Sequence, residues 1–281
     1  MPDDAALPAD GASPLSFSTR LAAAVAEAGA PLCVGLDPDP NRMPASFGAS
    51  AGDAAQFCIA ITESTAGVAA AFKPNLAFFE AYGPDGWDAL AEVCDAVRKT
   101  GRLLILDGKR GDIGNTGRRY AASLYDALGG DAATVAPYMG TDSVAPFLEH
   151  PGRCAFVLVA TSNPGGADLQ ALSVDGAPLY RHVARLASEA AAGLPGEAGF
   201  VVGATRPALL AALREAHPEV PFLVPGVGAQ GGSAADTLEA NAGGPILVNS
   251  SRGILYASSG ADYATAAREA AERLADSLAK A

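Results

Sequence analysis

Short apolar runs alternate with longer amphipathic segments along nearly the whole chain, and this alternation constrains the fold more than any other feature. Eight runs have the length of buried strands: Leu32–Leu36, Ala70–Lys73, Leu103–Leu106, Ala133–Ala136, Ala155–Ala160, Gly199–Val202, Phe222–Val224 and Ile246–Val248. Each run is followed by a segment with helical periodicity, although the one after Val224 is short. Strands that alternate with helices form parallel βαβ units, and eight units in 281 residues predict a closed (β/α)8 barrel. A doubly wound open sheet is the alternative.

The predicted helices are Ala-rich segments, and one of them precedes the first strand. They are Ser16–Ala28, Ala54–Ala66, Gly86–Thr100, Gly117–Leu128, Leu179–Ala192, Pro207–His217 and Asp262–Ala279. The chain shows no internal repeat, linker or change of composition between its halves, so we expect a single barrel domain over residues 15–281. Residues 1–14 are acidic and Pro-rich and lack the basic region of a secretory signal, which predicts a flexible N-terminal tail.

The composition is that of a folded, acidic protein. Hydrophobic residues make up 49% of the chain and charged residues 18%, which is enough apolar material for a large core. The formal net charge of -12 argues against nucleic acid as a partner, because phosphate backbones bind basic surfaces. A few local cations can still bind a small anion. No apolar run reaches the length of a membrane span, so we expect no membrane partner.

The four cysteines, Cys33, Cys58, Cys94 and Cys154, are scattered without a C-x-x-C spacing. Three of them lie in apolar runs, so we expect buried, reduced thiols, as is typical of a cytoplasmic protein. The chain has only three histidines, none of them spaced as metal ligands, and a zinc site is therefore not expected.

Polar residues follow the predicted strands at the ends that a barrel gathers on one rim. They are Asp37, Lys73, Asp107, Lys109, Ser162, Gln230 and Arg252, which follow or end strands 1, 2, 3, 5, 7 and 8. Catalytic residues of (β/α)8 barrels come from the C-terminal ends of several strands. A solvated loop residue is the ordinary explanation for any one of them, but their convergence on one rim predicts a site.

The segment Leu103–Thr116, L-L-I-L-D-G-K-R-G-D-I-G-N-T, concentrates charge at the end of a buried strand. Side chains two residues apart on a strand point the same way, so Asp107 and Lys109 should share one space. Asp112 lies beyond the strand on a Gly-rich loop. Charges at the end of an apolar run are costly unless they pair or act on a ligand. A salt bridge that closes the strand is the structural alternative.

Lys73, Asp107, Lys109 and Asp112 can form an array in which each ammonium group is flanked by carboxylates. Nearby carboxylates favour the protonated form of a lysine. A protonated lysine held in a dry pocket can stabilise a developing carbanion and then donate a proton to it. The array therefore suits a reaction in which negative charge develops on carbon.

The loops after strands 7 and 8 have the features of a phosphate site, which barrels often place there. Four glycines lie between Gly226 and Gly232, followed by Ser233 as a candidate helix cap. Glycines let backbone N–H groups approach an anion, and a helix N-terminus favours negative charge. Arg252 can bind phosphate with two hydrogen bonds. A tight turn beside a surface arginine is the alternative.

Five segments resemble the orotidine 5′-phosphate decarboxylase family, specifically its longer bacterial branch (type 2). They are F-K-P-N-L-A-F-F-E-A-Y-G from Phe72, L-D-G-K-R-G-D-I-G-N-T from Leu106, A-T-S-N-P-G from Ala160, P-G-V-G-A-Q-G-G from Pro225 and S-S-R-G from Ser250. The pattern D-x-K-x-x-D-I-x-x-T is highly specific. The resemblance implies a (β/α)8 barrel that converts orotidine monophosphate to uridine monophosphate and CO2 in de novo pyrimidine biosynthesis. It also implies a homodimer that needs neither a metal nor an organic cofactor.

The resemblance assigns a role to each candidate residue. Lys109 is expected to protonate C6 of the pyrimidine, Asp107 to face the departing carboxylate, and Lys73 to hold a ribose hydroxyl. Asp112 and Thr116 are expected to reach into the ribose site of a partner subunit. The remaining expected contacts are Asp37 with ribose, Ser162 with the pyrimidine ring, and Gln230 and Arg252 with phosphate.

Three other functions fit parts of the pattern. Related barrels with a D-x-K-x-x-D signature use magnesium on sugar phosphates as decarboxylases or aldolases, and Asp37, Asp107 and Asp112 offer oxygen ligands. A Schiff-base aldolase would use Lys109 as a nucleophile, but charged neighbours keep that amine protonated. A non-catalytic nucleotide-binding protein on the same scaffold is disfavoured, because the lysine–aspartate set and the phosphate loop are both intact.

Overall fold

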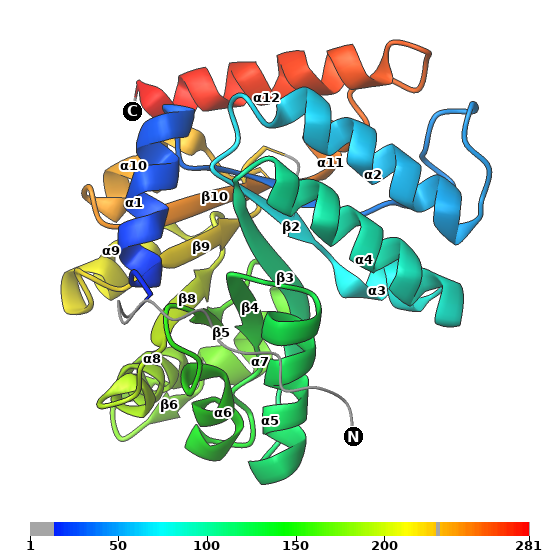
Figure 1. The fold of residues 1–281 in the computed structure, drawn as a ribbon. Helices are drawn as coiled ribbons and strands as arrows, with labels where there is room; N and C mark the ends of the chain where they lie inside the picture. Colours follow the sequence, from blue (N-terminus) through cyan, green and yellow to red (C-terminus); the bar gives the residue numbers. More distant parts are fainter. Residues whose placement is uncertain (1–13, 229–230, 281) are drawn as a thin grey trace, which may run out of the picture.

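Eight parallel strands close into a barrel in the computed structural model, which describes residues 14–228 and 231–280 (Figure 1). The barrel strands are β1 (Leu32–Leu36), β2 (Ala71–Pro74), β3 (Leu103–Arg110), β4 (Ala132–Val135), β5 (Cys154–Ala160), β8 (Glu197–Val202), β9 (Phe222–Pro225) and β10 (Ile246–Ser250). Their order around the ring is β1-β10-β9-β8-β5-β4-β3-β2. The closed ring confirms the (β/α)8 prediction and excludes the open doubly wound sheet. The predicted tail lies outside the described residues, except for Pro14.

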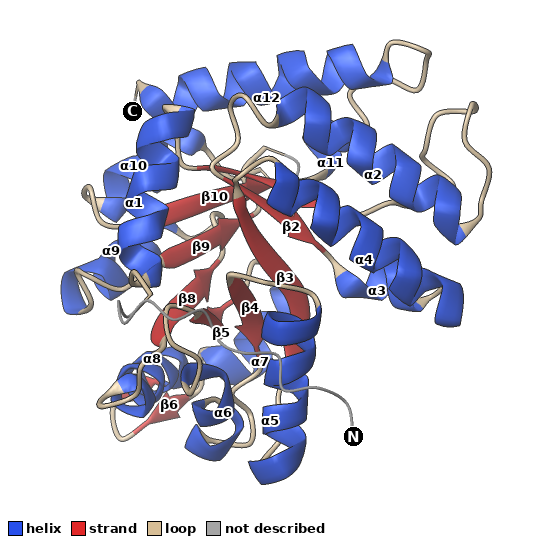
Figure 2. Ribbon diagram, in the orientation of Figure 1, coloured by secondary structure: helices blue, strands red, loops and turns tan. Residues whose placement is uncertain are grey.

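Helices surround the strands, as Figure 2 shows. The longer ones are α1 (Phe17–Ala28), α2 (Ala51–Thr65), α4 (Pro84–Lys99), α5 (Gly114–Ala122), α8 (Leu179–Ala191), α9 (Pro207–Ala216), α10 (Ala234–Asn241) and α12 (Tyr263–Ala279). Shorter helices are α3 (Leu76–Glu80), α6 (Ala145–Leu148), α7 (Ala167–Gln170) and α11 (Arg252–Leu255). Each predicted helix is present, and the one predicted over 117–128 consists of α5 and a π-helical turn, Ser123–Ala127. A small hairpin of β6 (Ser173–Val174) and β7 (Ala177–Pro178) precedes α8.

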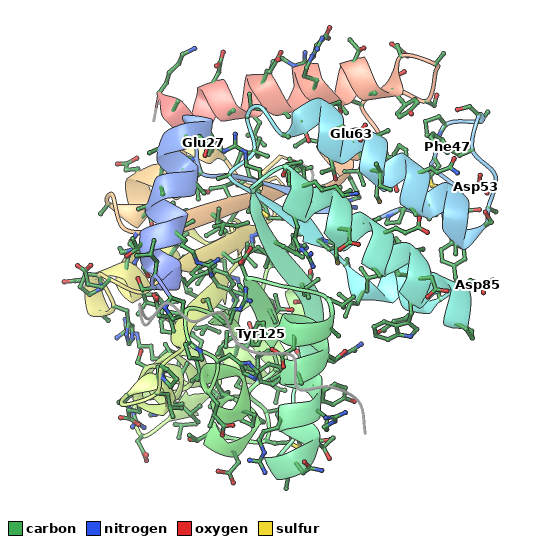
Figure 3. All side chains as sticks on the ribbon, viewed as in Figure 1. Glu27, Phe47, Asp53, Glu63, Asp85 and Tyr125 are labelled. Carbon is green, nitrogen blue, oxygen red and sulfur yellow. The ribbon has the colours of Figure 1, made fainter. Side chains whose placement is uncertain are left out.

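Local sequence signals explain where several helices begin. Ser50 and Asp53 form a reciprocal capping box at the start of α2, and Pro84 occupies the first turn of α4. Asp53 and Asp85 are the acidic residues of the two first turns, where they interact favourably with the helix dipoles. Figure 3 shows both at the same end of these neighbouring helices. No helix within the described ranges is long and apolar enough to cross a membrane.

The inside of the barrel changes from apolar to polar along the strands. Alternate residues point inward, and the lower interior cluster includes Ala71, Ile105 and Leu247. Phe17 and Leu21 of α1 belong to the same cluster, so α1 closes the N-terminal end of the barrel. Two residues further along the strands, the inward positions hold Lys73, Asp107 and Asn249. The strand periodicity therefore places the charged side chains as the uppermost layer of the barrel, at its C-terminal end.

Candidate active site

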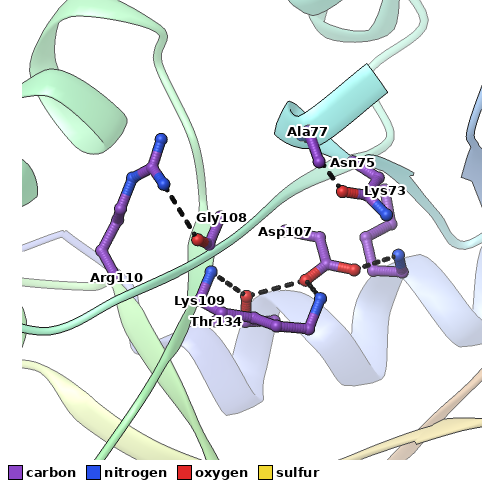
Figure 4. Close-up of polar contacts among 8 residues, drawn as sticks. All are labelled: Lys73, Asn75, Ala77, Asp107, Gly108, Lys109, Arg110 and Thr134. Carbon is purple, nitrogen blue, oxygen red and sulfur yellow. Dashed lines mark hydrogen bonds and ion pairs between the residues drawn. The ribbon is translucent and has the colours of Figure 1, made fainter. Parts of the chain in front are cut away.

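A buried carboxylate at the end of β3 holds two ammonium groups. Lys73 Nζ donates to Asp107 Oδ2 at 2.7 Å, and Lys109 Nζ donates to Asp107 Oδ1 at 2.6 Å. Thr134 Oγ1 from β4 donates a third hydrogen bond to Oδ1 at 2.9 Å (Figure 4). Lys73 and Asp107 are buried, whereas the Lys109 side chain is 49% exposed. The arrangement confirms that Asp107 and Lys109 share one space, next to Lys73.

The charges in this array stabilise one another. Burial by itself would raise the pKa of Asp107, but the neighbouring Lys73 and Lys109 outweigh it and hold that pKa well below its usual range. Burial by itself would lower the pKa of Lys73, but the carboxylates of Asp107 and Asp37 outweigh it and raise that pKa above its usual range. Lys73 is therefore a cation and Asp107 an anion throughout the neutral pH range.

The backbone of β3 is irregular where it presents Lys109. The register of β3 with β4 shifts between Leu106 and Arg110, and Lys109 has a positive φ of 46°. Positive φ is uncommon for a residue with a side chain and is a form of strain found at functional sites. Arg110, the next residue, points away from the array in Figure 4 and pairs with Glu80 of α3. The bulge thus separates two neighbouring cations, only one of which joins the array.

The array opens into a cavity of about 510 Å³, a volume that suits a small organic ligand. Its polar lining includes the three residues of the array and also Thr161, Ser162 and Arg252. Leu158, Val201 and Leu223 supply an apolar part of the wall. Ser162 Oγ is buried and has no hydrogen-bond partner among the described residues, so a ligand can satisfy it.

A second cavity of about 170 Å³ adjoins the first and shares Lys73, Asp107, Pro225 and Arg252 with it. Three of its lining atoms are buried and lack hydrogen-bond partners within the described part of the chain: Asp37 Oδ1, Asn249 Oδ1 and Ser251 Oγ. Buried polar atoms are nearly always paired in folded proteins. This concentration of unpaired atoms indicates a place for polar ligand groups.

The loop after β9 is a tight turn built on glycines. Gly226, Gly228 and Gly231 all have positive φ values, of 103°, 76° and 86°. The Gly228 and Gly232 N–H groups bond to carbonyls inside the loop, so these amides hold the turn rather than a ligand. Ser233 accepts a hydrogen bond from the Asp236 N–H and caps α10, which confirms that prediction. Gln230 lies outside the described residues.

Arg252, at the start of α11, lines both cavities and is exposed. Within residues 14–228 and 231–280 it has no ionic or hydrogen-bonded side-chain partner. An arginine in this position can bind an anionic group of a ligand in the cleft.

The structure does not bring every predicted residue to one place. Asp112 lies outside the Lys73–Asp107–Lys109 array within one chain, where its Oδ1 accepts a hydrogen bond from the Ile113 N–H. Thr116 is exposed on the first turns of α5. A four-membered array of two lysines and two aspartates is therefore not present in the single chain, because the loop after β3 carries Asp112 away from the cavity.

Three polar residues of the site were not predicted from the sequence: Thr134, Asn249 and Ser251. Thr134 is the only polar residue of β4, A-A-T-V. Asn249 is the last residue of β10 that faces into the barrel. In both strands the preceding inward-facing residue, two positions earlier, is apolar. This alternation is the signal that could have identified Thr134 and Asn249. The described residues contain no group of three or more His, Cys, Asp or Glu side chains arranged to hold a metal ion. In particular, Asp37, Asp107 and Asp112 do not form such a group.

The fold and the site together are those of a (β/α)8-barrel enzyme, in which charged groups gather at the C-terminal ends of the strands. Residues 30–270 match the model of the orotidine 5'-phosphate decarboxylase / HUMPS family, and the chain belongs to this family. It is 49% identical over 251 residues to the orotidine 5'-phosphate decarboxylase of Roseiflexus castenholzii, covering 88% of this chain and 91% of that one. It is 47% identical to that of Variovorax paradoxus, covering 94% and 98% of the two chains. The structure of Leishmania donovani OMP decarboxylase is similar, with a TM-score of 0.81, 40% identity and coverage of 95% and 100%.

Proposed function

We propose that this protein is an orotidine 5′-phosphate decarboxylase, which forms uridine monophosphate and CO2 from orotidine monophosphate in de novo pyrimidine biosynthesis. The observation that carries the proposal is the Lys73–Asp107–Lys109 array, built on a buried carboxylate, which opens into a cleft that Arg252 also lines. The similar proteins of Roseiflexus castenholzii and Variovorax paradoxus bear the name of this activity.

The cleft suits a nucleotide in one orientation. The phosphate lies at Arg252, with Gln230 as a further proposed contact, because these residues follow the strands that commonly bind phosphate in barrels. The ribose hydroxyls lie at the smaller cavity, where Asp37 Oδ1 is unpaired and Lys73 is adjacent. Ser162 Oγ then meets the pyrimidine ring, whose C6 position faces Lys109.

The chemical step is the heterolysis of the bond between C6 and the carboxylate carbon. The electron pair stays on C6 and CO2 leaves, so the developing charge is a carbanion next to the Lys109 ammonium group. Lys109 Nζ gives one proton to C6 and regains one from solvent through its exposed side. Asp107 faces the substrate carboxylate, and the apolar wall of Leu158, Val201 and Leu223 favours neutral CO2 over the anion. The step uses no metal or organic cofactor.

The layout of the cleft explains how a difficult step can be accelerated. The carbanion has poor delocalisation, so the barrier without catalysis is very high. Binding energy from the phosphate at Arg252 and from the ribose can position the ring against Lys109. Because the array is already paired around Asp107, little reorganisation is needed at the moment of reaction.

We propose further that the protein works as a homodimer, in which Asp112 and Thr116 reach the ribose site of the partner subunit. Both residues lie on the surface segment after β3, next to Ile113, which is 53% exposed. Tyr138 and Met139, after β4, are 88% and 50% exposed and add further apolar surface. Exposed apolar side chains of this size often mark a protein interface.

We propose the cytoplasm as the compartment. All four cysteines are free and buried, as the sequence predicts. Burial raises the pKa of Cys33 and of Cys94 to about 12, so these thiols stay protonated and unreactive. Such thiols are typical of proteins from reducing compartments.

The test is to mix purified protein with orotidine monophosphate and follow the absorbance of the pyrimidine, with and without a metal chelator. We expect complete conversion to uridine monophosphate at the same rate in both samples. Absence of turnover would contradict the proposed activity. Turnover that disappears with the chelator and returns with magnesium would instead favour a magnesium-dependent mechanism.

A further inference from the structure

Thr134 of β4 contacts both Asp107 and Lys109 of β3. It is 2% exposed, and it is the only polar residue of β4. Its Oγ1 donates to Asp107 Oδ1 at 2.9 Å and accepts a hydrogen bond from the Lys109 backbone N–H at 2.9 Å (Figure 4). One hydroxyl therefore contacts both the carboxylate of the array and the backbone that presents the cation.

These two contacts fix the roles of the hydroxyl group. A threonine hydroxyl has one proton to donate and lone pairs that accept. The backbone N–H of Lys109 can only donate, so the hydroxyl must accept there and its own proton remains for Asp107. The carboxylate Oδ1 then receives two donors, Lys109 Nζ and Thr134 Oγ1, which leaves it little freedom to rotate.

The backbone contact compensates for the bulge in β3. Where β3 and β4 lose their regular register, the Lys109 N–H bonds to a side chain of β4, whereas the regular ladder bonds backbone to backbone. This contact supports Lys109 in its left-handed conformation, with φ of 46°, which is costly for a residue other than glycine. Beyond the bulge the strands pair again, because the Ala136 N–H bonds to the Arg110 carbonyl at 2.8 Å.

We propose that Thr134 is a positioning residue for the decarboxylation, acting through Asp107 and Lys109. Its hydroxyl orients the Asp107 carboxylate and holds the Lys109 backbone, from which the Lys109 side chain extends into the cavity. The inference rests on the proposed function. It predicts that loss of the hydroxyl lowers kcat and leaves nucleotide binding at Arg252 and Asp37 nearly unchanged, because the hydroxyl bonds to neither residue.

Two substitutions separate the hydroxyl from the rest of the side chain. Thr134→Val keeps the shape and removes both hydrogen bonds, whereas Thr134→Ser keeps the hydroxyl and loses a methyl group. Thr65→Val is the matched control, because Thr65 is also fully buried and its Oγ1 donates to the Ile61 carbonyl at 2.8 Å, within α2. The control reports what the loss of any buried threonine hydroxyl does to the protein.

The experiment measures kcat and KM with orotidine monophosphate, the affinity for uridine monophosphate, and the melting temperature of the four proteins. For Thr134→Val we expect kcat to fall about 10- to 100-fold, the loss of a hydrogen bond to a charged group, with product affinity within about twofold. Thr134→Ser should keep kcat within about threefold of the parent protein, and Thr65→Val should change only the melting temperature.

Several results would overturn the inference. They are an unchanged kcat in Thr134→Val, an equal loss in the serine and valine variants, and a loss that Thr65→Val reproduces. If Thr134→Val does not fold, the Ser variant decides, since a serine protein with kcat reduced tenfold or more would show that the methyl group matters rather than the hydroxyl. A parent protein without turnover would overturn the proposed function and this inference together, whereas a parent protein with turnover isolates the role of Thr134.

Discussion

We call the part of the cleft around Lys109 and the part around Arg252 its two ends, and these ends are built in different ways. At the Lys109 end, the side chains come from β2, β3 and β4, are paired with one another, and surround a buried carboxylate. At the Arg252 end, the chain is a glycine-rich turn and an exposed arginine without an ionic partner among the described residues. The charged groups of the first end are paired within the chain, whereas Arg252 at the second end has no ionic partner among the described residues. The difference supports our proposal that the reaction takes place at the Lys109 end and that the Arg252 end binds the anionic group of the substrate.

The largest effect is expected at the Lys109 end, from Lys109→Ala. Removal of the proposed proton donor and of the cation beside the carbanion should lower kcat by at least about 10,000-fold. Affinity for uridine monophosphate, measured by calorimetry, should change far less because the phosphate contact survives. Ordinary turnover by this variant would remove Lys109 from its proposed role.

At the Arg252 end, Arg252→Ala should weaken both substrate affinity and kcat/KM, by roughly 100-fold in kcat/KM. The phosphate contact is present in the ground state and in the transition state, so both quantities report it. Steady-state kinetics of Arg252→Lys, as a companion variant, would show how much of the effect requires bidentate hydrogen bonding by the guanidinium group. Kinetics that do not change would place the phosphate elsewhere.

The two ends should also differ in stability. Asp107→Asn leaves the buried Lys73 without its counter-ion, so we expect a loss of about 3 kcal/mol in the free energy of unfolding. Arg252→Ala should stay within about 0.5 kcal/mol of the parent protein, because the side chain is exposed. Urea denaturation of both variants measures the contrast. Equal losses would show that the array is not the more tightly coupled end.

The pH dependence of stability follows from the same charges. The folded pKa of Asp107 is below its ordinary 3.8, so its contribution is present above about pH 4 and is lost as the pH falls further. The folded pKa of Lys73 is above its ordinary 10.5, so its contribution is present below that pH and is lost as the pH rises through the higher value. In Asp107→Asn the carboxylate that outweighs burial is gone, so the folded pKa of Lys73 falls and the penalty for burying its charge is lost as the pH rises. The stability deficit of Asp107→Asn against the parent protein should therefore shrink as the pH rises from about 5 to about 9. Denaturation curves in which the deficit grows over this window would contradict the assigned charges.

Much of the fold was predictable because two periodicities are unusually clear. The eight strands and the principal helices lie within a few residues of their predicted bounds, since buried apolar runs and Ala-rich amphipathic segments alternate without interruption. Two irregular elements were not predicted. The hairpin of β6 and β7 was missed although its two-residue turn, Asp175-Gly176, has positive φ at both residues and is a sequence signal for a hairpin. The π-helical turn Ser123–Ala127 has no comparable pattern, because it depends on packing rather than on local periodicity.

The site was predictable where residues follow one another on a strand, and less so where strands must be aligned. Asp107 and Lys109 meet as expected, but through a bulge with a left-handed Lys109, which no alternation pattern predicts. Thr134 escaped notice because its role depends on the register of β4 against β3. Asp112 was grouped with the array on sequence proximity alone, and the turn after β3 separates it within one chain.

A crystal structure with bound uridine monophosphate tests the contrast between the two ends most directly. We expect the phosphate at Arg252, the ribose at Asp37, and C6 of the ring facing Lys109 Nζ, with Lys73, Asp107 and Thr134 bonded as they are without ligand. A nucleotide bound with its phosphate on Lys73 and Lys109 and its base at Arg252 would contradict the assignment of anion binding and reaction to these ends.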